Sequence, residues 1–452
     1  MRGAKGPFNH PFSLRLRPPS GQASRPSFGA VLTDARSEHS DLEEIATMAL
    51  PDEERLNQIR QSLAEGGLDA LLLLYPDDIL MATGMLPAST HVAVLVDRDG
   101  RVSLLTPWWR EAFVAEESWA DRIDSFEWCK RGYDVDPDRA VIEWLRTERS
   151  GQGIEKVGAH LQVHHYCPNK MPSECLTYDR IRAELPSIFP AVEDAGDRIN
   201  QLKSVKTSRE VGKLKLAHQV VRAGAQAFYQ LAQAGIREID LATEVHCAVL
   251  RQGAALGIDY VFCEMPQITS GPERTGIADT LSNHPTARRL QPGDPVLLEL
   301  GAHAEGYWAD ITRATVVGEP TDLLRKLHQA VLDAQAAAIA RYIPGESTGE
   351  QLCEASWQAM REAGFEQGIT HFLGHGLGFA YHEDRPTLGP GQNRPVLPGQ
   401  VTSIEPGLYW REGGRPLGGI RVEENVVWGS KAGQAEILSD YYRGLDRAGA
   451  EF

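Results

Sequence analysis

The chain has 452 residues and a formal net charge of −16, from 62 Asp and Glu against 46 Lys and Arg. This length predicts two or three domains, at roughly 100–200 residues per domain. The acidic balance argues against a nucleic-acid partner, which requires a basic face. No apolar stretch approaches the ~18 residues of a membrane span. We therefore expect a globular protein without nucleic-acid or membrane partners.

Six cysteines are scattered along the chain, and none forms a C-x-x-C pair. This spacing argues against a zinc ribbon or a thioredoxin motif. Six cysteines in so long a chain are too sparse for a disulfide scaffold. The cysteines therefore indicate free thiols in a reducing compartment, and we predict a cytoplasmic protein.

Residues 1–47 differ in composition from the rest, being rich in Arg, Pro, Gly and Ser. No apolar segment follows the basic residues, so a secretory signal is excluded. We predict a disordered tail, or an upstream start codon with Met48 as the natural start. An Arg-rich and acid-poor composition also permits a transit peptide.

Residues 48–198 carry signals of both helices and strands. Asp52 is placed to cap a helix that ends at Gly66-Gly67. A buried strand is predicted over 69–75, and a hairpin is predicted around 97–100. Helix and strand signals then alternate to about residue 195. This pattern predicts an α/β domain, which shows no catalytic motif of its own.

Residues 199–452 begin with a capping box at Thr207–Glu210, and a second box lies at Thr348–Gln351. The order of helices followed by strands occurs twice between 205 and 430, which suggests an internal duplication. We predict an α+β domain with helices packed on an antiparallel sheet. The predicted helices span about 207–234, 240–252, 322–342 and 348–363.

Two strand-like runs between 294 and 313 flank the segment His303–Gly306. If these four residues form the loop, Glu299 lies directly opposite Asp310, and both side chains share one face. Opposed carboxylates repel each other unless a cation lies between them. In a different register one of the two acids would face solvent. The hairpin sequence alone does not decide between these registers.

Three histidines, His371, His375 and His382, lie within the glycine-rich segment 370–383. The glycines argue against a helix and suggest close backbone approach to a site. Further on, Glu405 ends a strand at the Pro406-Gly407 turn.

A final strand is predicted over 418–428, with Arg421, Glu423 and Asn425 on one face. Charged side chains inside an apolar strand need partners if they are buried.

These elements occur in an order that resembles the pita-bread metallopeptidases, the group of methionine aminopeptidase, aminopeptidase P and prolidase (Xaa-Pro dipeptidase). The matching segments are Glu299, Asp310-Ile-Thr-Arg313, Gly374-His375-Gly376, Ile404-Glu405-Pro-Gly-Leu-Tyr409 and Gly419-Ile-Arg-Val-Glu423. Residues 55–84 resemble the creatinase-type domain that precedes the catalytic domain in the Xaa-Pro branch. The resemblance covers about 50–445, and it implies a creatinase-like domain (48–198), a pita-bread catalytic domain (199–452) and a homodimer.

The resemblance also implies a site for two divalent metals. The matching ligand positions are Glu299, Asp310, His375, Glu405 and Glu423. The family has Asp at the position of Glu299. The resemblance implies two metals, and the longer side chain leaves one metal or none as alternatives. An oxygen-rich cage with one imidazole suits Mn²⁺ best, with Co²⁺ or Zn²⁺ as alternatives.

The implied reaction is hydrolysis of the peptide bond before proline in dipeptides or short peptides, by a metal-activated water. Glu405 would move the proton, while His371 and His382 would hold the substrate and stabilise the oxyanion. Arg421 would brace the ligand cage at the substrate site.

The family also carries a histidine shortly before the first ligand. Here Ser282 occupies that position and His284 lies two residues later.

Two alternatives stay open. The first is a metal-free or mononuclear C–N hydrolase of creatinase or ectoine hydrolase type, in which Glu299 attacks the substrate. Against it, the chain keeps the other four ligand positions, and acids crowded without a cation would need strongly raised pKa values. The second is a non-catalytic binding module, a role usually accompanied by loss of most of the cage.

Overall fold

The computed structural model describes residues 50–87, 91–128, 136–162, 178–277, 284–431 and 433–446. The predictions for the 1–47 tail and for Ser282 fall outside these residues. Within them, Cys247, Cys263 and Cys353 are free thiols. No helix in these ranges combines the length and the apolar character needed to cross a membrane.

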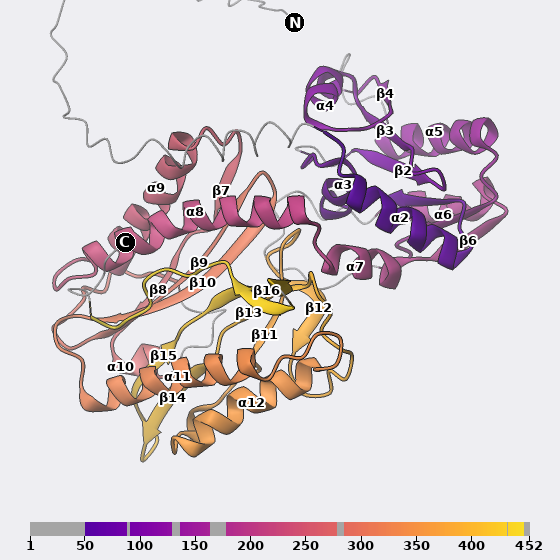
Figure 1. Cartoon of the computed structure of the whole chain (residues 1–452). Helices are drawn as coiled ribbons and strands as arrows, with labels where there is room; N and C mark the ends of the chain where they lie inside the picture. The colour runs from indigo at the N-terminus through magenta and orange to yellow at the C-terminus, as the bar shows by residue number, and fades with distance from the viewer. Residues whose placement is uncertain are drawn as a thin grey trace, which may run out of the picture. The chain divides into compact units, whose positions relative to one another are not determined.

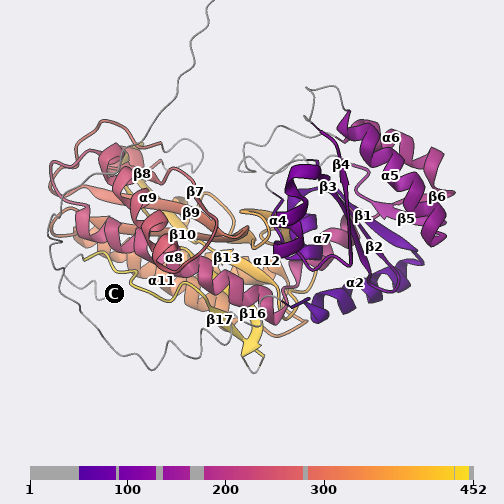
Figure 2. The same cartoon turned by 90° about the horizontal axis from the view of Figure 1, so that it is seen from above.

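The first domain is a six-stranded mixed sheet in the order β4-β3-β2-β1-β5-β6. Alternate residues of β1 pack in different cores: Leu71 packs with α2 and α3, and Leu72 with α5 and α6. Helices therefore cover both faces (Figure 2), as the α/β prediction requires. The elements are α2 Glu53–Gly66, β1 Ala70–Leu73, α3 Pro76–Thr83, β2 Ala93–Asp97, β3 Val102–Pro107, α4 Glu111–Glu117, β4 Arg122–Phe126, α5 Pro137–Gln152, β5 Lys156–Ala159, α6 Asp179–Ile188, β6 Ala191–Asp194 and α7 Gly196–Ser204.

The second domain places its antiparallel strands between two helix pairs, α8 with α9 and α11 with α12 (Figure 1). One sheet has the order β10-β9-β7, with β8 also paired to β9, and another has the order β12-β11-β13-β16-β17. This arrangement confirms the predicted α+β class. The elements are α8 Ser208–Leu231, α9 Glu238–Ala255, β7 Val261–Cys263, β8 Gln267–Ser270, α10 Pro272–Thr275, β9 Pro295–Ala304, β10 Tyr307–Val316, α11 Asp322–Ala340, α12 Gly349–Glu362, β11 Gly374–Gly376, β12 Glu383–Leu388, β13 Val401–Ile404, β14 Gly407–Glu412, β15 Arg415–Arg421, β16 Glu424–Lys431 and β17 Gln434–Ile437.

The predicted helix caps are present, and two of them bind each other. Asp52 caps α2, and Thr207 and Glu210 form the capping box of α8. The hydroxyl of Thr207 also donates to Asp52 at 2.6 Å. The buried Arg55 donates from Nε to Glu210 at 2.8 Å. These contacts join the first helix of one domain to the first helix of the next.

The β9–β10 hairpin corrects the predicted register. Glu299 lies opposite Thr312, and Asp310 lies opposite Gly301. The turn consists only of Glu305 and Gly306, with φ angles of 52° and 94°. Positive φ at both positions is what a tight two-residue hairpin needs, and Asn-Gly rather than Glu-Gly signals it. Since the register shifts by two residues, Glu299 and Asp310 still share a face.

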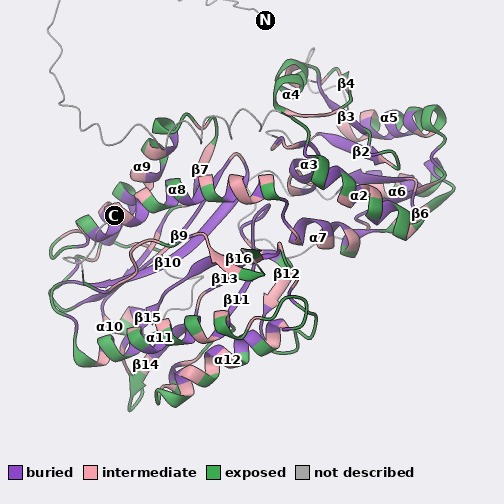
Figure 3. Ribbon diagram, in the orientation of Figure 1, coloured by how far each residue is buried: buried purple, intermediate pink, exposed green. Residues whose placement is uncertain are grey.

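The strand predicted over 418–428 is in fact two strands, β15 and β16, which lie in different sheets. The chain crosses between the sheets at Val422-Glu423, where no Gly or Pro marks a break. The strand ends because β15 pairs with β14, whereas β16 pairs with β13. This crossing brings Glu423 beside Thr312, whose carbonyl accepts from the Glu423 amide at 3.1 Å. Figure 3 shows how deeply the strands of this domain are buried.

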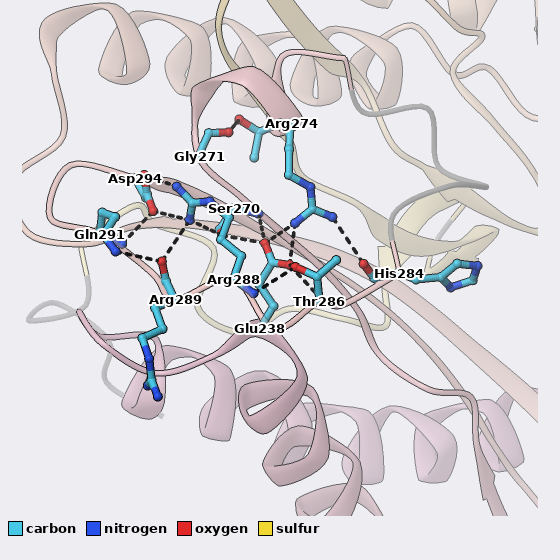
Figure 4. Close-up of polar contacts among 11 residues, drawn as sticks. Glu238, Ser270, Gly271, Arg274, His284, Thr286, Arg288, Arg289, Gln291 and Asp294 are labelled. Atoms are coloured by element: carbon cyan, nitrogen blue, oxygen red, sulfur yellow. Dashed lines mark hydrogen bonds and ion pairs between the residues drawn. The ribbon is translucent and has the colours of Figure 1, made fainter.

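A buried carboxylate, Glu238, ties the start of α9 to the segments that lead into β9 (Figure 4). It accepts from the amide and hydroxyl of Ser270 at 2.9 and 2.6 Å. It also accepts from the amide and hydroxyl of Thr286 at 3.0 and 2.6 Å, and it pairs with Arg274. Burial would raise the pKa of Glu238, but these hydrogen bonds lower it overall.

Removing this carboxylate should destabilise the protein. For Glu238→Ala we expect a loss of about 2–4 kcal/mol in the free energy of unfolding, because buried donors lose their acceptor. The lowered pKa means that the charged form contributes stability above the ordinary value of 4.5, and that this contribution disappears as pH falls. The difference from wild type should therefore shrink on acidification.

Urea unfolding followed by circular dichroism at neutral and acidic pH measures this difference. Glu244→Ala, an exposed change on the same helix, is the matched control and should stay within ~0.5 kcal/mol of wild type. Equal stability of the two variants at neutral pH would contradict the prediction.

Candidate metal and catalytic site

The five predicted ligands come together from five parts of the second domain. Their carboxylate oxygens and imidazole nitrogens form overlapping groups in which the atoms lie within 4.8 Å of one another. Each group has a geometry that could hold a metal ion. The groups are Glu299, Asp310 and Glu423; His375, Glu405 and Glu423; and Asp310, His375 and His382. The last group adds His382, which we had predicted to contact substrate, to the potential ligands.

The carboxylates of this cluster lie close enough to perturb one another. Burial, followed by repulsion from neighbouring acids, raises the pKa values of Asp310 and Glu423 well above their ordinary range. Burial likewise raises the pKa of Glu405. Among the described residues, Oδ1 of Asp310 and Oε1 of Glu423 are buried without a hydrogen-bond partner. Buried, unpartnered carboxylate oxygens are what a hard divalent cation requires, so the residues fit a metal.

Glu299 differs from the other acids because three donors hold it. Thr312 donates to it at 2.8 Å, Tyr381 donates at 3.1 Å, and Arg421 forms an ion pair with it. Burial would raise the pKa of Glu299, but Arg421 and these hydrogen bonds lower it overall. Glu299 is therefore held as a charged carboxylate.

Arg421 is buried, and its guanidinium donates hydrogen bonds to neighbouring side chains. Besides the Glu299 pair, Nε donates to the Thr312 hydroxyl at 2.9 Å, and Nη1 donates to the Tyr409 hydroxyl at 2.8 Å. Each guanidinium nitrogen therefore contacts one of these neighbours, and this bonding braces the site.

His375 is oriented by its own backbone. Its Nδ1 lies 2.9 Å from the Gly376 carbonyl, which leaves Nε2 facing Glu405 at 3.4 Å and Asp310 at 3.6 Å. Burial lowers the pKa of His375, which favours the neutral form that binds metal. A Cβ on Gly374 would lie 2.2 Å from the Ser403 carbonyl, so close strand contact explains the glycine.

The remaining histidines border this cluster. His371 has Nε2 3.1 Å from the Tyr409 hydroxyl. His382 stacks on Tyr381 with ring centroids 4.8 Å apart, and its ring lies 3.8 Å from that of His375. Burial lowers the pKa of His371, and burial with the nearby His375 lowers that of His382 to about 2. Both rings are therefore neutral at physiological pH.

His284, the other candidate, is exposed, and only its carbonyl joins the Glu238 cluster, through Arg274 at 3.3 Å (Figure 4). It belongs to none of the potential metal groups within the described part of the chain.

Sequence reasoning missed several residues that hold the ligands. Thr312 lies two positions after Asp310, and this spacing could have placed it on the ligand face. Tyr381 and Ser403 carry no comparable signal. Glu264 was also missed; burial, with the nearby Glu299 charge, raises its pKa to about 7.

Comparisons with known proteins identify the family and the fold. The model of metallopeptidase family M24 matches residues 212–429, and that of the creatinase/prolidase N-terminal domain matches residues 55–203. The chain is 30% identical to the uncharacterized peptidase YqhT of Bacillus subtilis over 379 residues, covering 82% of this chain and 94% of the relative. It is 25% identical to the Xaa-Pro dipeptidase of Pyrococcus furiosus over 375 residues, with 83% and 94% covered.

The fold is shared with solved structures. The prolidase from Pyrococcus horikoshii OT3 superposes with a TM-score of 0.68 at 22% identity, covering 87% of this chain and all 100% of that one. The X-Pro aminopeptidase from Thermotoga maritima gives 0.69 at 24% identity, with 85% and 99% covered. Together with the family matches, these structures confirm the pita-bread architecture behind a creatinase-type domain. The chain belongs to metallopeptidase family M24.

Proposed function

We propose that this protein is a divalent-metal-dependent hydrolase that cleaves the peptide bond before proline in dipeptides or short peptides. The observation that carries the proposal is the cluster of five ligand-type side chains with two buried, unpartnered carboxylate oxygens. The relative from Pyrococcus furiosus, described as an Xaa-Pro dipeptidase, supports the choice of substrate.

The metal would be held by the five side chains predicted from sequence. Mn²⁺ suits the set best, because it is rich in carboxylate oxygen and poor in imidazole. A bound divalent ion supplies Lewis-acid polarisation of the scissile carbonyl and lowers the pKa of water. The proposed ligands are Glu299, Asp310, His375, Glu405 and Glu423.

Glu405 is the proposed proton carrier. Its Oε1 accepts from the Ser403 hydroxyl at 3.1 Å, which fixes the carboxyl beside His375. Burial raises the pKa of Glu405, which suits a group that takes up a proton and later releases it. In the proposal it receives a proton from the attacking water and delivers it to the departing proline nitrogen.

His371 and His382 are proposed to hold the scissile carbonyl. Neutral imidazoles donate from one ring nitrogen and carry no charge that would compete for the carboxylates. Arg421 is proposed as a positioning residue, because it keeps Glu299 charged and fixes the hydroxyl of Tyr409 next to His371.

The first prediction from this function concerns metal and activity together. Purified protein should carry one to two equivalents of transition metal per chain, hydrolyse Xaa-Pro dipeptides, and lose that activity with chelator. Elemental analysis measures the metal content. Assays of Ala-Pro, longer Xaa-Pro peptides and ectoine-type amides measure the activity. Full activity in metal-free protein would reject the proposed function.

Glu299→Asp separates the peptidase from a hydrolase that uses Glu299 as nucleophile. Since the family has Asp at this position, the variant should keep or raise Ala-Pro hydrolysis. Attack by Glu299 instead predicts collapse of activity, because the shortened side chain cannot reach the same atom. Assays at matched metal content make the comparison, with exposed Glu412→Asp as the control.

Glu423→Gln tests whether a metal relieves the repulsion among the clustered acids. Without metal, the variant should be at least as stable as wild type, because it removes one of the crowded acids. Added Mn²⁺ at 100 times its Kd should stabilise wild type by about 2.7 kcal/mol and the variant far less. Thermal unfolding with and without Mn²⁺, with Glu412→Gln as control, measures both effects. A metal-free variant much less stable than wild type would instead indicate a purely structural carboxylate.

A further inference from the structure

A further acid, Glu264, lies on the same sheet face as the proposed ligands. It follows β7, where Cys263 pairs with Ala302 of β9. The Glu264 amide continues this ladder by donating to the Gly301 carbonyl at 3.1 Å. Residues directly opposite in an antiparallel pair share a face, and alternate residues of one strand do so too. Glu264 therefore shares the face of Gly301 and Glu299.

A local irregularity places a second polar side chain on that face. Gln267 of β8 pairs with Glu299, so the register shifts by one residue between β7 and β8. Met265 and Pro266 together stand opposite Leu300, as in a β-bulge. Residues three apart on a regular strand would point to opposite faces. Because of the bulge, Glu264 and Gln267 both lie on the ligand face.

These two side chains leave acceptors without donors. Oε1 of Gln267 is buried and has no hydrogen-bond partner among the described residues. Within the same residues, no ion pair or side-chain hydrogen bond neutralises the half-buried Glu264. The nearby guanidinium of Arg421 is already committed to Glu299, Thr312 and Tyr409. This part of the face thus offers excess negative charge and an open carbonyl.

These acceptors suit a cation that carries several hydrogen-bond donors and is not a metal ion. Glu264 belongs to none of the potential metal groups found in the described ranges. An alkylammonium has three N–H donors and a full positive charge, which match one carboxylate and neighbouring acceptors. In an Xaa-Pro peptide, the free α-ammonium lies one carbon from the scissile carbonyl. A group that binds it must therefore border the metal cluster.

We propose that Glu264 binds the α-ammonium group of the substrate's N-terminal residue, with the Gln267 carbonyl as a neighbouring acceptor. The inference rests on the proposed function and adds the subsite that would require a free amino terminus. Glu264 is then a specificity-determining residue, outside the metal ligands and outside the proton transfer.

Two probes that differ only in the amine isolate this contact. Ala-Pro carries the ammonium, whereas propionyl-proline has the same skeleton without it. Isothermal titration in a Glu405→Gln background measures binding without turnover. Adding Glu264→Gln should weaken Ala-Pro binding by roughly 10- to 100-fold, the range for a charge-assisted hydrogen bond. Propionyl-proline binding should not change.

The controls separate charge recognition from a structural effect. Glu264→Asp should recover part of the Ala-Pro affinity, because it restores the charge. Glu319→Gln, at a side chain that is 90% exposed, should change neither probe. Metal content is measured for every variant, and the Glu264 variants should match their Glu405→Gln parent.

The outcomes distinguish the inference from the function on which it rests. The inference is overturned if Glu264→Gln affects both probes equally or affects neither. It is also overturned if the parent does not bind Ala-Pro. Cleavage of Xaa-Pro dipeptides together with an equal effect rejects the subsite and keeps the proposed function. Amine-specific, Glu264-dependent binding without any cleavage supports the subsite and rejects the proposed function.

Discussion

The site is governed by the repulsion among carboxylates buried close together. Burial, together with repulsion from neighbouring acids that include Glu405, raises the pKa values of Asp310 and Glu423. The guanidinium of Arg421 is paired with Glu299. Such crowding is unfavourable in a folded interior unless protons or cations compensate the charge. Folding and metal binding are therefore expected to be coupled, since whatever neutralises the cluster also stabilises the fold.

The same constraint explains why the site lies where the two helix-and-strand halves meet. The first half contributes Glu299 and Asp310 from the β9–β10 hairpin, and the second contributes His375, Glu405 and Glu423. Neither half alone brings a histidine and a full set of acids together. The internal duplication suggested by the sequence would supply two similar scaffolds, and the cluster depends on side chains that differ between them.

Much of this arrangement could be predicted because its signals are local. Capping boxes specify their own hydrogen bonds, and both appear as expected. The order of the motifs around Asp310, His375 and Glu405 was enough to predict the fold and the set of clustered residues. The exact register of the hairpin could not be predicted, because Glu305 adopts a turn conformation that its residue type does not signal. The break at Val422-Glu423 and the bulge that directs Glu264 both depend on pairing with distant strands.

Thr312 adds a constraint of a different kind. Its hydroxyl oxygen lies 2.8 Å from Glu299 and 2.9 Å from Glu423, and it accepts from Arg421 at 2.9 Å. A hydroxyl has one hydrogen, so it serves only one of these two carboxylates at a time. Rotation of that single O–H makes the two carboxylates compete for one donor. The carboxylate that does not receive this hydrogen must find another donor or a cation.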